Sequence, residues 1–211
     1  MRYVSQNISW HGVAAVAAWV LVFCGPLDAR QCLSPSPTLQ KGEDPYGPIA
    51  SRELTPSEHE QLVRLFKSLA GDWAGAAASF FCASAWNPDD VEHRRETIKA
   101  RVQVDRGGNL QMAAELYSER ERSSHQKHLR FYLNPNQLRL NNDNGTGDVE
   151  LIEVADTRIA FLYRRMLPGA GGSSIRQEYF FTLEKDADGF RIEEMLFVQG
   201  KLSSGYTWQF K

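Results

Sequence analysis

The run Gly71-Asp72-Trp73-Ala74-Gly75 stands where the hydrophobic period of the chain changes from helical to strand-like. Before this run, apolar residues recur three and four positions apart, as they do on one face of a helix. After it, apolar and polar residues alternate over most of residues 76–211, as they do in half-buried strands. The run therefore separates a short helical segment from a long β-rich region.

The helical segment begins at a recognisable N-terminal signal. In the run from Thr55 to Glu58, Thr55 is a capping residue, Pro56 suits the first helical position and Glu58 completes a capping box. An apolar stripe follows at positions i, i+3, i+4 and i+7, namely Leu62, Leu65, Phe66 and Leu69. The sequence predicts a short helix that ends at Gly71 and covers one end of the structure that follows.

Turn signals divide the β-rich region at regular intervals. Gly-Gly, Asn-Pro, Asn-Gly and Asp-Gly pairs separate runs such as residues 97–104, where polar and apolar residues alternate without error. Short connections favour antiparallel neighbours and hence a meander. A meander of this many twisted strands either closes into a barrel or splits into two packed sheets. About ten strands are predicted, near residues 72–82, 94–105, 109–119, 126–133, 137–141, 148–154, 158–167, 174–185, 189–200 and 204–211.

The first 29 residues are predicted to be a signal peptide. Arg2 supplies a short positive segment, the eleven residues 13–23 are apolar, and Ala29 precedes the cleavage site. A helix that spans a bilayer needs about 20 apolar residues, so this segment is too short to be one. The alternatives are an uncleaved anchor and a lipidated Cys24. Cleavage predicts an exported protein, periplasmic or extracellular, with no integral membrane span.

The rest of the chain is predicted to be a tail and one domain. Residues 30–54 are rich in Pro, Ser and Gly, and their four prolines are expected to prevent both a helix and a strand ladder. Residues 55–211 make the domain of helix and barrel. The formal net charge of −2 gives no basic excess, so no nucleic-acid partner is expected.

Two cysteines remain once the first 29 residues are removed, Cys32 in the tail and Cys82 at the end of the first predicted strand. An even number of cysteines in an oxidising compartment favours a disulfide. The bond would fasten the tail to the barrel. The alternative is two free thiols, one of them in a loose tail.

The helical segment, the Gly71-x-Trp73-x-Gly75 run and the meander together resemble the calycins, small barrels that include lipocalins, fatty-acid-binding proteins and nitrobindin. The resemblance covers about two-thirds of the chain. It implies an all-β fold, an antiparallel meander of about ten strands closed into a barrel with one short N-terminal helix. Trp73 would then be structural, at the closed end of the barrel. Lipocalins lay a basic residue of the last strand over this tryptophan, and Lys211 is the nearest candidate here.

The calycin resemblance implies a cavity but no cofactor. Haem-binding relatives need an axial histidine in a late strand. After the signal peptide, every histidine of this chain precedes residue 129. No metal site is predicted either, because the sequence contains no Cys/His zinc signature.

Alternation predicts which side chains face the inside of the barrel. In the last four predicted strands the inward faces are apolar except at Arg165, Gln177 and Glu194. These three, with Tyr163 and Tyr179, are the predicted ligand-binding residues, which would orient a polar head group inside an apolar barrel. The alternative is that Arg165 lies near a rim and pairs with Glu194, or that both reach solvent.

Two further expectations follow from the same alternation. The polar residues of the outward faces are expected in water; they are Arg176, Glu178, Thr182, Glu184, Arg191 and Glu193. The inward aromatic residues of the last strand are expected in the core rather than at a ligand; they are Tyr206, Trp208 and Phe210.

Three classes of function remain. The first is an exported barrel that binds an apolar or amphiphilic small molecule. The second is a cell-envelope scaffold or interaction protein with a filled barrel, whose protein partner the sequence does not name. The third is a small barrel enzyme that uses Glu194 and a tyrosine, which is less favoured because no catalytic motif is present. A membrane β-barrel is disfavoured because long charged side chains such as Lys99 and Arg176 crowd one face of the strands.

Overall fold

The computed structural model describes residues 32–42, 52–143 and 145–211. The predicted signal peptide and the middle of the predicted tail lie outside these residues. The described part of the chain holds two α-helices, a 3-10 turn and eleven antiparallel strands. The helices are α1 (Pro37–Gln40) and α2 (Pro56–Ser68), and the turn is η3 (Ala170–Gly172). The strands are β1 (Gly71–Cys82), β2 (Val91–Val104), β3 (Leu110–Ser118), β4 (Ser123–Asn134), β5 (Gln137–Asn142), β6 (Gly145–Asp148), β7 (Glu150–Ala155), β8 (Arg158–Pro168), β9 (Ser174–Lys185), β10 (Phe190–Val198) and β11 (Lys201–Phe210).

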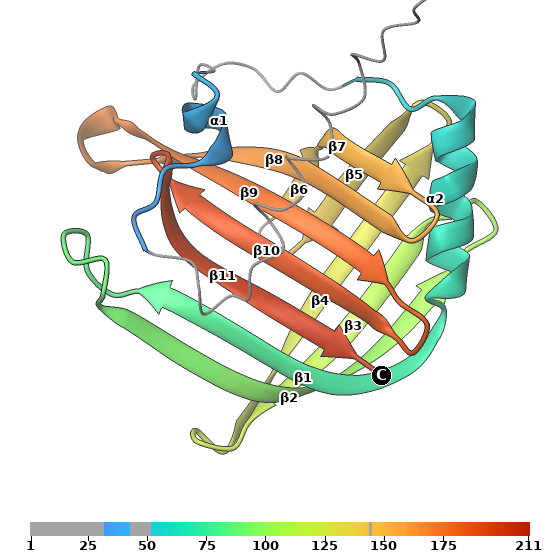
Figure 1. The fold of residues 1–211 in the computed structure, drawn as a ribbon, viewed down its shortest axis with the longest axis horizontal. Helices are drawn as coiled ribbons and strands as arrows, with labels where there is room; N and C mark the ends of the chain where they lie inside the picture. The colour runs from blue at the N-terminus through green and yellow to red at the C-terminus, as the bar shows by residue number, and fades with distance from the viewer. Residues whose placement is uncertain (1–31, 43–51, 144) are drawn as a thin grey trace, which may run out of the picture. The chain divides into compact units, whose positions relative to one another are not determined.

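The strands form one sheet that curls into a nearly closed barrel (Figure 1). Their order is β6-β5-β4-β3-β2-β1-β11-β10-β9-β8-β7, so the first and last strands pair, and the edge strands of the sheet are β6 and β7. At the seam between these edges, β6 lies against β8. The predicted all-β meander is thus confirmed, with eleven strands rather than ten. The additional strand is β6, which pairs with β5 and lies in the gap between the strands predicted near residues 137–141 and 148–154.

Helix α2 begins and packs as the sequence predicts. The Thr55 hydroxyl accepts from the Glu58 amide at 3.2 Å, and the Glu58 carboxylate accepts from the Thr55 amide at 2.9 Å. Leu62, Leu65 and Phe66 are fully buried in the barrel core. The helix stands across one end of the strands in Figure 1, and its burial closes that end.

The interior is lined by the inward faces that alternation predicts. Ile159, Phe161, Phe181, Leu183, Phe190, Ile192, Trp208 and Phe210 are all buried in one core cluster. A series of ring contacts runs from the closed end into the barrel. Phe66 of α2 stacks on Phe131, which contacts Phe161 and Phe181 at centroid distances of 5.9 and 5.7 Å. The end of the barrel nearest α2 is therefore packed with aromatic side chains.

Three outward-facing charges are buried, which corrects the expectation that they lie in water. Arg176, Glu178 and Glu193 expose 2%, 0% and 8% of their surface. The β8–β9 register places Arg164 directly opposite Glu178. The Glu178 carboxylate accepts from Arg176 at 2.6 Å and from Arg164 at 3.3 Å. Paired guanidinium groups therefore offset the cost of burying this carboxylate, a pairing that alternation alone does not reveal.

Residues 32–42 of the tail are ordered against the barrel, which corrects the expectation that prolines prevent regular structure there. Pro37 occupies the first turn of α1, a position that needs no amide donor, and Ser36 caps the helix. Leu33 and Ser34 exchange backbone hydrogen bonds with Leu202 at 3.0 and 2.8 Å. The tail can pair there because β1 ends before it reaches the first residues of β11.

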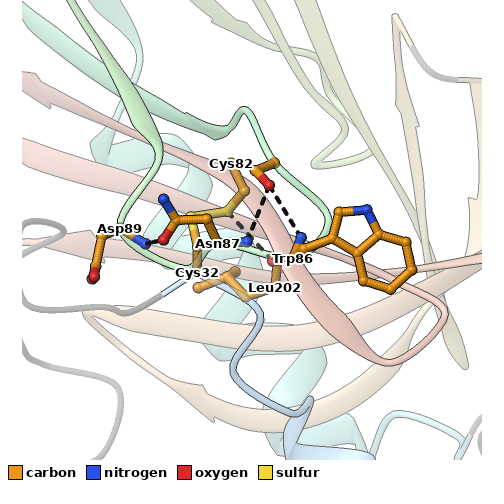
Figure 2. The surroundings of a disulfide bond; sticks show 7 residues. Cys32, Cys82, Trp86, Asn87, Asp89 and Leu202 are labelled. Atoms are coloured by element: carbon orange, nitrogen blue, oxygen red, sulfur yellow. Dashed lines mark hydrogen bonds between the residues drawn. A yellow bond between two sulfur atoms is a disulfide. The ribbon is translucent and has the colours of Figure 1, made fainter.

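The predicted disulfide between Cys32 and Cys82 is present and fastens this tail segment to the end of β1. Figure 2 shows the bond beside Leu202, with Trp86 pointing away from it. The Cα atoms of the two cysteines are 5.7 Å apart, a typical spacing for a disulfide. The bond therefore acts at the same place as the backbone pairing of the tail with β11.

The Gly-x-Trp-x-Gly run has a physical explanation at each of its named positions. Gly71 has a φ of 145°, which L side chains rarely adopt. The Trp73 indole donates to the Leu69 carbonyl at 2.8 Å and meets Phe190 edge-on, so it links the end of α2 to the barrel. At Gly75 an added Cβ would collide with the backbone carbonyl of Gln209 in β11. The run thus allows the chain to turn from α2 into β1 and allows the β1 backbone to approach the last strand closely.

The close approach at Gly75 predicts a mutational effect. Gly75→Ala forces the β1 and β11 backbones apart and is expected to lower the free energy of unfolding by about 2–3 kcal/mol, as overpacking does. Gly147→Ala in β6 is the matched control, because no atom lies within 4 Å of the added Cβ, and a change under about 0.5 kcal/mol is expected there. Urea unfolding of both variants checks the prediction. Equal stabilities of the two variants would contradict it.

Candidate functional site

A cavity of about 360 Å³ opens at the end of the barrel opposite α2. Strand β1 starts beside α2, and its far end contributes Ser79 and Phe81 to the wall. Further walls come from β4, β8, β9, β10 and β11. We call this cavity the mouth pocket; its polar side chains include Lys127, Arg165, Gln177, Tyr179, Glu194 and Tyr206.

Glu194 of β10 is the one carboxylate among these polar side chains, and it is buried, with 5% of its surface exposed. The Tyr163 hydroxyl donates to its Oε2 at 2.7 Å. Asn142 of β5 donates to the Tyr163 oxygen at 2.8 Å. Because Asn142 supplies a proton to the tyrosine oxygen, the single tyrosine proton is directed at Glu194.

Burial sets the protonation of this group. Desolvation raises the pKa of Glu194 to about 7, although the Tyr163 hydrogen bond and the charge of Lys127 act in the opposite direction. Burial also raises the pKa of Tyr163 and of Tyr206 well above the ordinary tyrosine value. At neutral pH the tyrosines therefore remain neutral donors, while Glu194 lies close to its midpoint.

The neighbouring strands β8 and β9 add three more polar side chains to the pocket wall, Arg165, Gln177 and Tyr179. The Tyr179 hydroxyl donates to Gln177 Oε1 at 2.8 Å, and its ring stacks on Tyr163 with centroids 4.4 Å apart. Burial raises the pKa of Tyr179, while the nearby Arg165 lowers it. The Arg165 guanidinium reaches across the seam toward β6, where a Cβ on Gly145 would be 3.5 Å from its Nη2.

The structure brings the five sequence-predicted ligand-binding residues together. Arg165, Gln177, Tyr179 and Glu194 line the mouth pocket, and Tyr163 lies against Glu194 and Tyr179. Arg165 is only partly buried, as expected of a residue near the rim. Among the described residues, no ion pair joins Arg165 to Glu194; the described partner of the carboxylate is a tyrosine.

Three residues of the site were missed from the sequence. Lys127 shares the inward face of β4 with Leu129 and Phe131, so extending the alternation by one step would have found it. Tyr206 was expected in the core, whereas it lines the pocket. Asn142 reaches Tyr163 from β5 across the barrel, and no local pattern indicates such a contact.

A second feature lies outside the barrel, beside the disulfide. Trp86 in the β1–β2 connection exposes 92% of its surface. Its backbone amide and that of Asn87 both donate to the Ser84 hydroxyl, at 3.1 and 3.0 Å. Figure 2 shows the indole projecting away from Cys82. An exposed tryptophan on a hydrogen-bonded connection suits contact with another molecule.

Comparison with known proteins leaves the family open: no family model and no curated protein matches this chain. The nearly closed antiparallel barrel is consistent with calycin architecture. None of the described helices is long and apolar enough to cross a membrane. In the described residues, no group of three or more His, Cys, Asp or Glu side chains is placed to hold a metal ion.

The raised pKa of Glu194 predicts how stability depends on pH. The unfolded chain loses this proton near the ordinary value of 4.5 and the folded chain loses it at about 7. Between these values the folded state binds more protons, so the contribution of Glu194 to stability falls as pH rises, by about 3 kcal/mol in total. Chemical unfolding of the wild type and of Glu194→Gln from pH 4.5 to 8 measures this. A constant difference between the two proteins across this range would contradict the prediction.

Proposed function

We propose that this chain is an exported β-barrel protein that binds an amphiphilic small molecule at the mouth of its barrel. The observation that carries this proposal is a buried carboxylate, Glu194, in the wall of an open cavity of about 360 Å³. Small-molecule sites combine a concave, partly apolar wall with a few converging polar groups, and their volumes begin near 300 Å³. The mouth pocket has this composition.

The position of the pocket suggests how a ligand lies in it. The side chains of Phe131, Phe161 and Phe181 contact one another and fill the barrel between Tyr163 and α2. The apolar part of a ligand would therefore rest near the mouth, against the apolar lining residues Phe81, Leu167 and Leu196. Its polar part would meet the charged side chains of the same pocket. The ligand is thus a compact amphiphile rather than a long chain threaded through the barrel.

The disulfide supports export. Structural disulfides persist in oxidising compartments and are rare in the cytosol. The Cys32–Cys82 bond fits the signal peptide predicted for residues 1–29, which lie outside the described part of the chain. Intact-mass analysis of the protein recovered from its host checks this; an exported form that still begins at Met1 would contradict cleavage.

The binding proposal is tested with a pair of isosteric probes, 2-naphthoate and 2-naphthamide, titrated calorimetrically into the protein. Ser79→Phe fills the pocket from β1 and is expected to abolish binding of both probes. Ala76→Phe on the exposed face of the same strand is the control and should bind as the wild type does. Native mass spectrometry of the protein from its own compartment adds a search for the natural ligand. The proposal fails if neither probe binds, or if Ser79→Phe binds as well as the control.

Arg165 is expected to act in binding rather than in folding. Its guanidinium is partly exposed and has no ion pair with Glu194, so Arg165→Leu should change the free energy of unfolding by less than about 1 kcal/mol. The same change removes a charge-assisted contact with a bound polar group, which is expected to weaken 2-naphthoate binding about tenfold or more. A stability loss of about 3–5 kcal/mol would instead indicate a structural ion pair.

The exposed Trp86 favours a second candidate function, an interaction protein of the cell envelope. Its test is a photo-crosslinking amino acid placed at Trp86 in living cells. Tyr117 is the control position, because it is also an exposed aromatic residue at 43%. A defined product from position 86 alone supports an interface there. Identical patterns from both positions would contradict it.

A further inference from the structure

The polar groups of the mouth pocket are strongly biased toward hydrogen-bond donors. Arg165 and Lys127 are cations that only donate, and the Gln177 carbonyl already accepts from Tyr179, which leaves its amide group to donate. Among the described residues that line the pocket, Glu194 is the only acid. One of its oxygens is occupied by the Tyr163 hydroxyl. A ligand that satisfies this wall must itself be rich in acceptors.

We infer that the ligand of the mouth pocket is an amphiphilic anion, and that Glu194 takes up a proton when this anion binds. The inference rests on the proposed function and adds the charge of the ligand and the state of Glu194. An oxyanion in the pocket can accept from Arg165 and from the Gln177 amide. It cannot lie beside a second carboxylate without repulsion, unless that carboxylate is protonated and donates.

The surroundings of Glu194 allow this protonation. Tyr163 of β8, Tyr179 of β9 and Tyr206 of β11 face it as neutral hydroxyl groups. Lys127 of β4 acts on it as a positive charge and is itself within 3.8 Å of Asp143, and Arg165 lies in the same wall. Within the described residues, no ion pair therefore holds Glu194 in its charged form, and its pKa of about 7 favours proton uptake near neutral pH.

Proton uptake makes anion binding depend on pH, and the affinity for the anion falls as pH rises. Below pH 7 Glu194 is already protonated in the free protein, so an anion binds without further change. Above pH 7 the free protein must first gain a proton, and the affinity falls about tenfold for each pH unit. With the pKa at about 7, the dissociation constant of an anion should be about tenfold larger at pH 8 than at pH 6. A neutral ligand of the same shape should show no such change.

The test titrates 2-naphthoate and 2-naphthamide into the full chain at pH 6 and pH 8, in two buffers of different ionisation enthalpy. The expected result is that 2-naphthoate binds more tightly than 2-naphthamide at pH 6, weakens about tenfold by pH 8 and takes up nearly one proton at pH 8. Glu194→Gln, which keeps a neutral donor in place, should bind 2-naphthoate with the same affinity at both pH values. Circular dichroism confirms that each variant is folded.

A histidine control separates the contribution of Glu194 from that of His125, an imidazole on β4. His125 lies two residues before Lys127 on β4, 3.5 Å from Glu96. His125→Gln should leave the pH dependence of 2-naphthoate binding unchanged. A pH dependence that survives Glu194→Gln or disappears in His125→Gln overturns the inference.

The outcomes also distinguish this inference from the proposed function. If both probes bind in the pocket with equal, pH-independent affinity, or if 2-naphthamide alone binds, the proposed function stands and the anion inference is wrong. If neither probe binds, both are wrong. Tighter binding of 2-naphthoate with proton uptake at Glu194 supports both.

Discussion

Replacing both Cys32 and Cys82 by serine is expected to lower the free energy of unfolding by about 4 kcal/mol, because the disulfide joins residues 50 positions apart and restricts the unfolded chain. The loop that it closes contains α2 and most of β1. Without the bond, residues 32–42 keep the backbone hydrogen bonds of Leu33 and Ser34 with Leu202 in β11, and that of Ser36 with Gly200 just before β11. We therefore expect the tail segment to detach before the barrel unfolds.

Equilibrium unfolding in urea and amide hydrogen exchange test both parts of this prediction. The first measures the loss of global stability, and the second should show faster exchange at Leu202, whose amide donates to Ser34. Ala83→Ser is the matched control, because it introduces a serine at the exposed position next to Cys82 and leaves the Cys32–Cys82 pair intact. A loss below about 1 kcal/mol, or unchanged exchange at Leu202, would contradict the proposed role of the disulfide.

The elements that were predicted well are those governed by local chemistry. The cap formed by Thr55 and Glu58 sets the start of α2, and the apolar stripe of that helix decides its buried face. The period of two in β8–β11 assigned residues such as Phe161 and Trp208 to the interior correctly. Because register follows from alternation once one face is buried, the same reasoning brought Arg165, Gln177 and Glu194 to one site.

The elements that were missed depend on contacts between distant segments. The outward face of β9 carries Glu178, whose burial depends on Arg164 in the neighbouring strand and on coverage of that face. The tail residues around Pro35 gain structure only because the start of β11 offers unpaired backbone groups. Alternation separates two faces of a strand, but it does not say which outer faces another segment covers.

The depth of the mouth pocket also follows from long-range packing. Between Tyr163 and the closed end, aromatic side chains of α2, β4, β8 and β9 pack against one another. The cavity is therefore confined to the mouth of the barrel. The sequence placed aromatic side chains inside the barrel without deciding whether the barrel was open or filled. The structure shows aromatic packing at the closed end and a cavity at the mouth, so a packed core and a cavity share one barrel.

Phe131 lies at the centre of the aromatic packing at the α2 end of the barrel. Phe131→Ala is therefore expected to lower the free energy of unfolding by about 4 kcal/mol. Its side chain is fully buried, stacks on Phe66 of α2 at 5.2 Å and contacts Phe161 and Phe181. Truncation leaves a cavity bordered by three rings, and it also loosens the contact that holds α2 on the barrel. The loss should therefore exceed that of a surface aromatic residue by several kcal/mol.

Tyr132→Ala provides the comparison, since Tyr132 is the next residue of β4, faces outward and is only partly buried. Its truncation should cost about 1 kcal/mol or less. Binding of 2-naphthamide is expected to persist in folded Phe131→Ala protein, because the mouth pocket is lined by other residues. If Phe131→Ala and Tyr132→Ala are equally stable, the α2 end of the barrel is not packed as described. If Phe131→Ala stays folded but loses the probe, the ligand reaches deeper than the mouth.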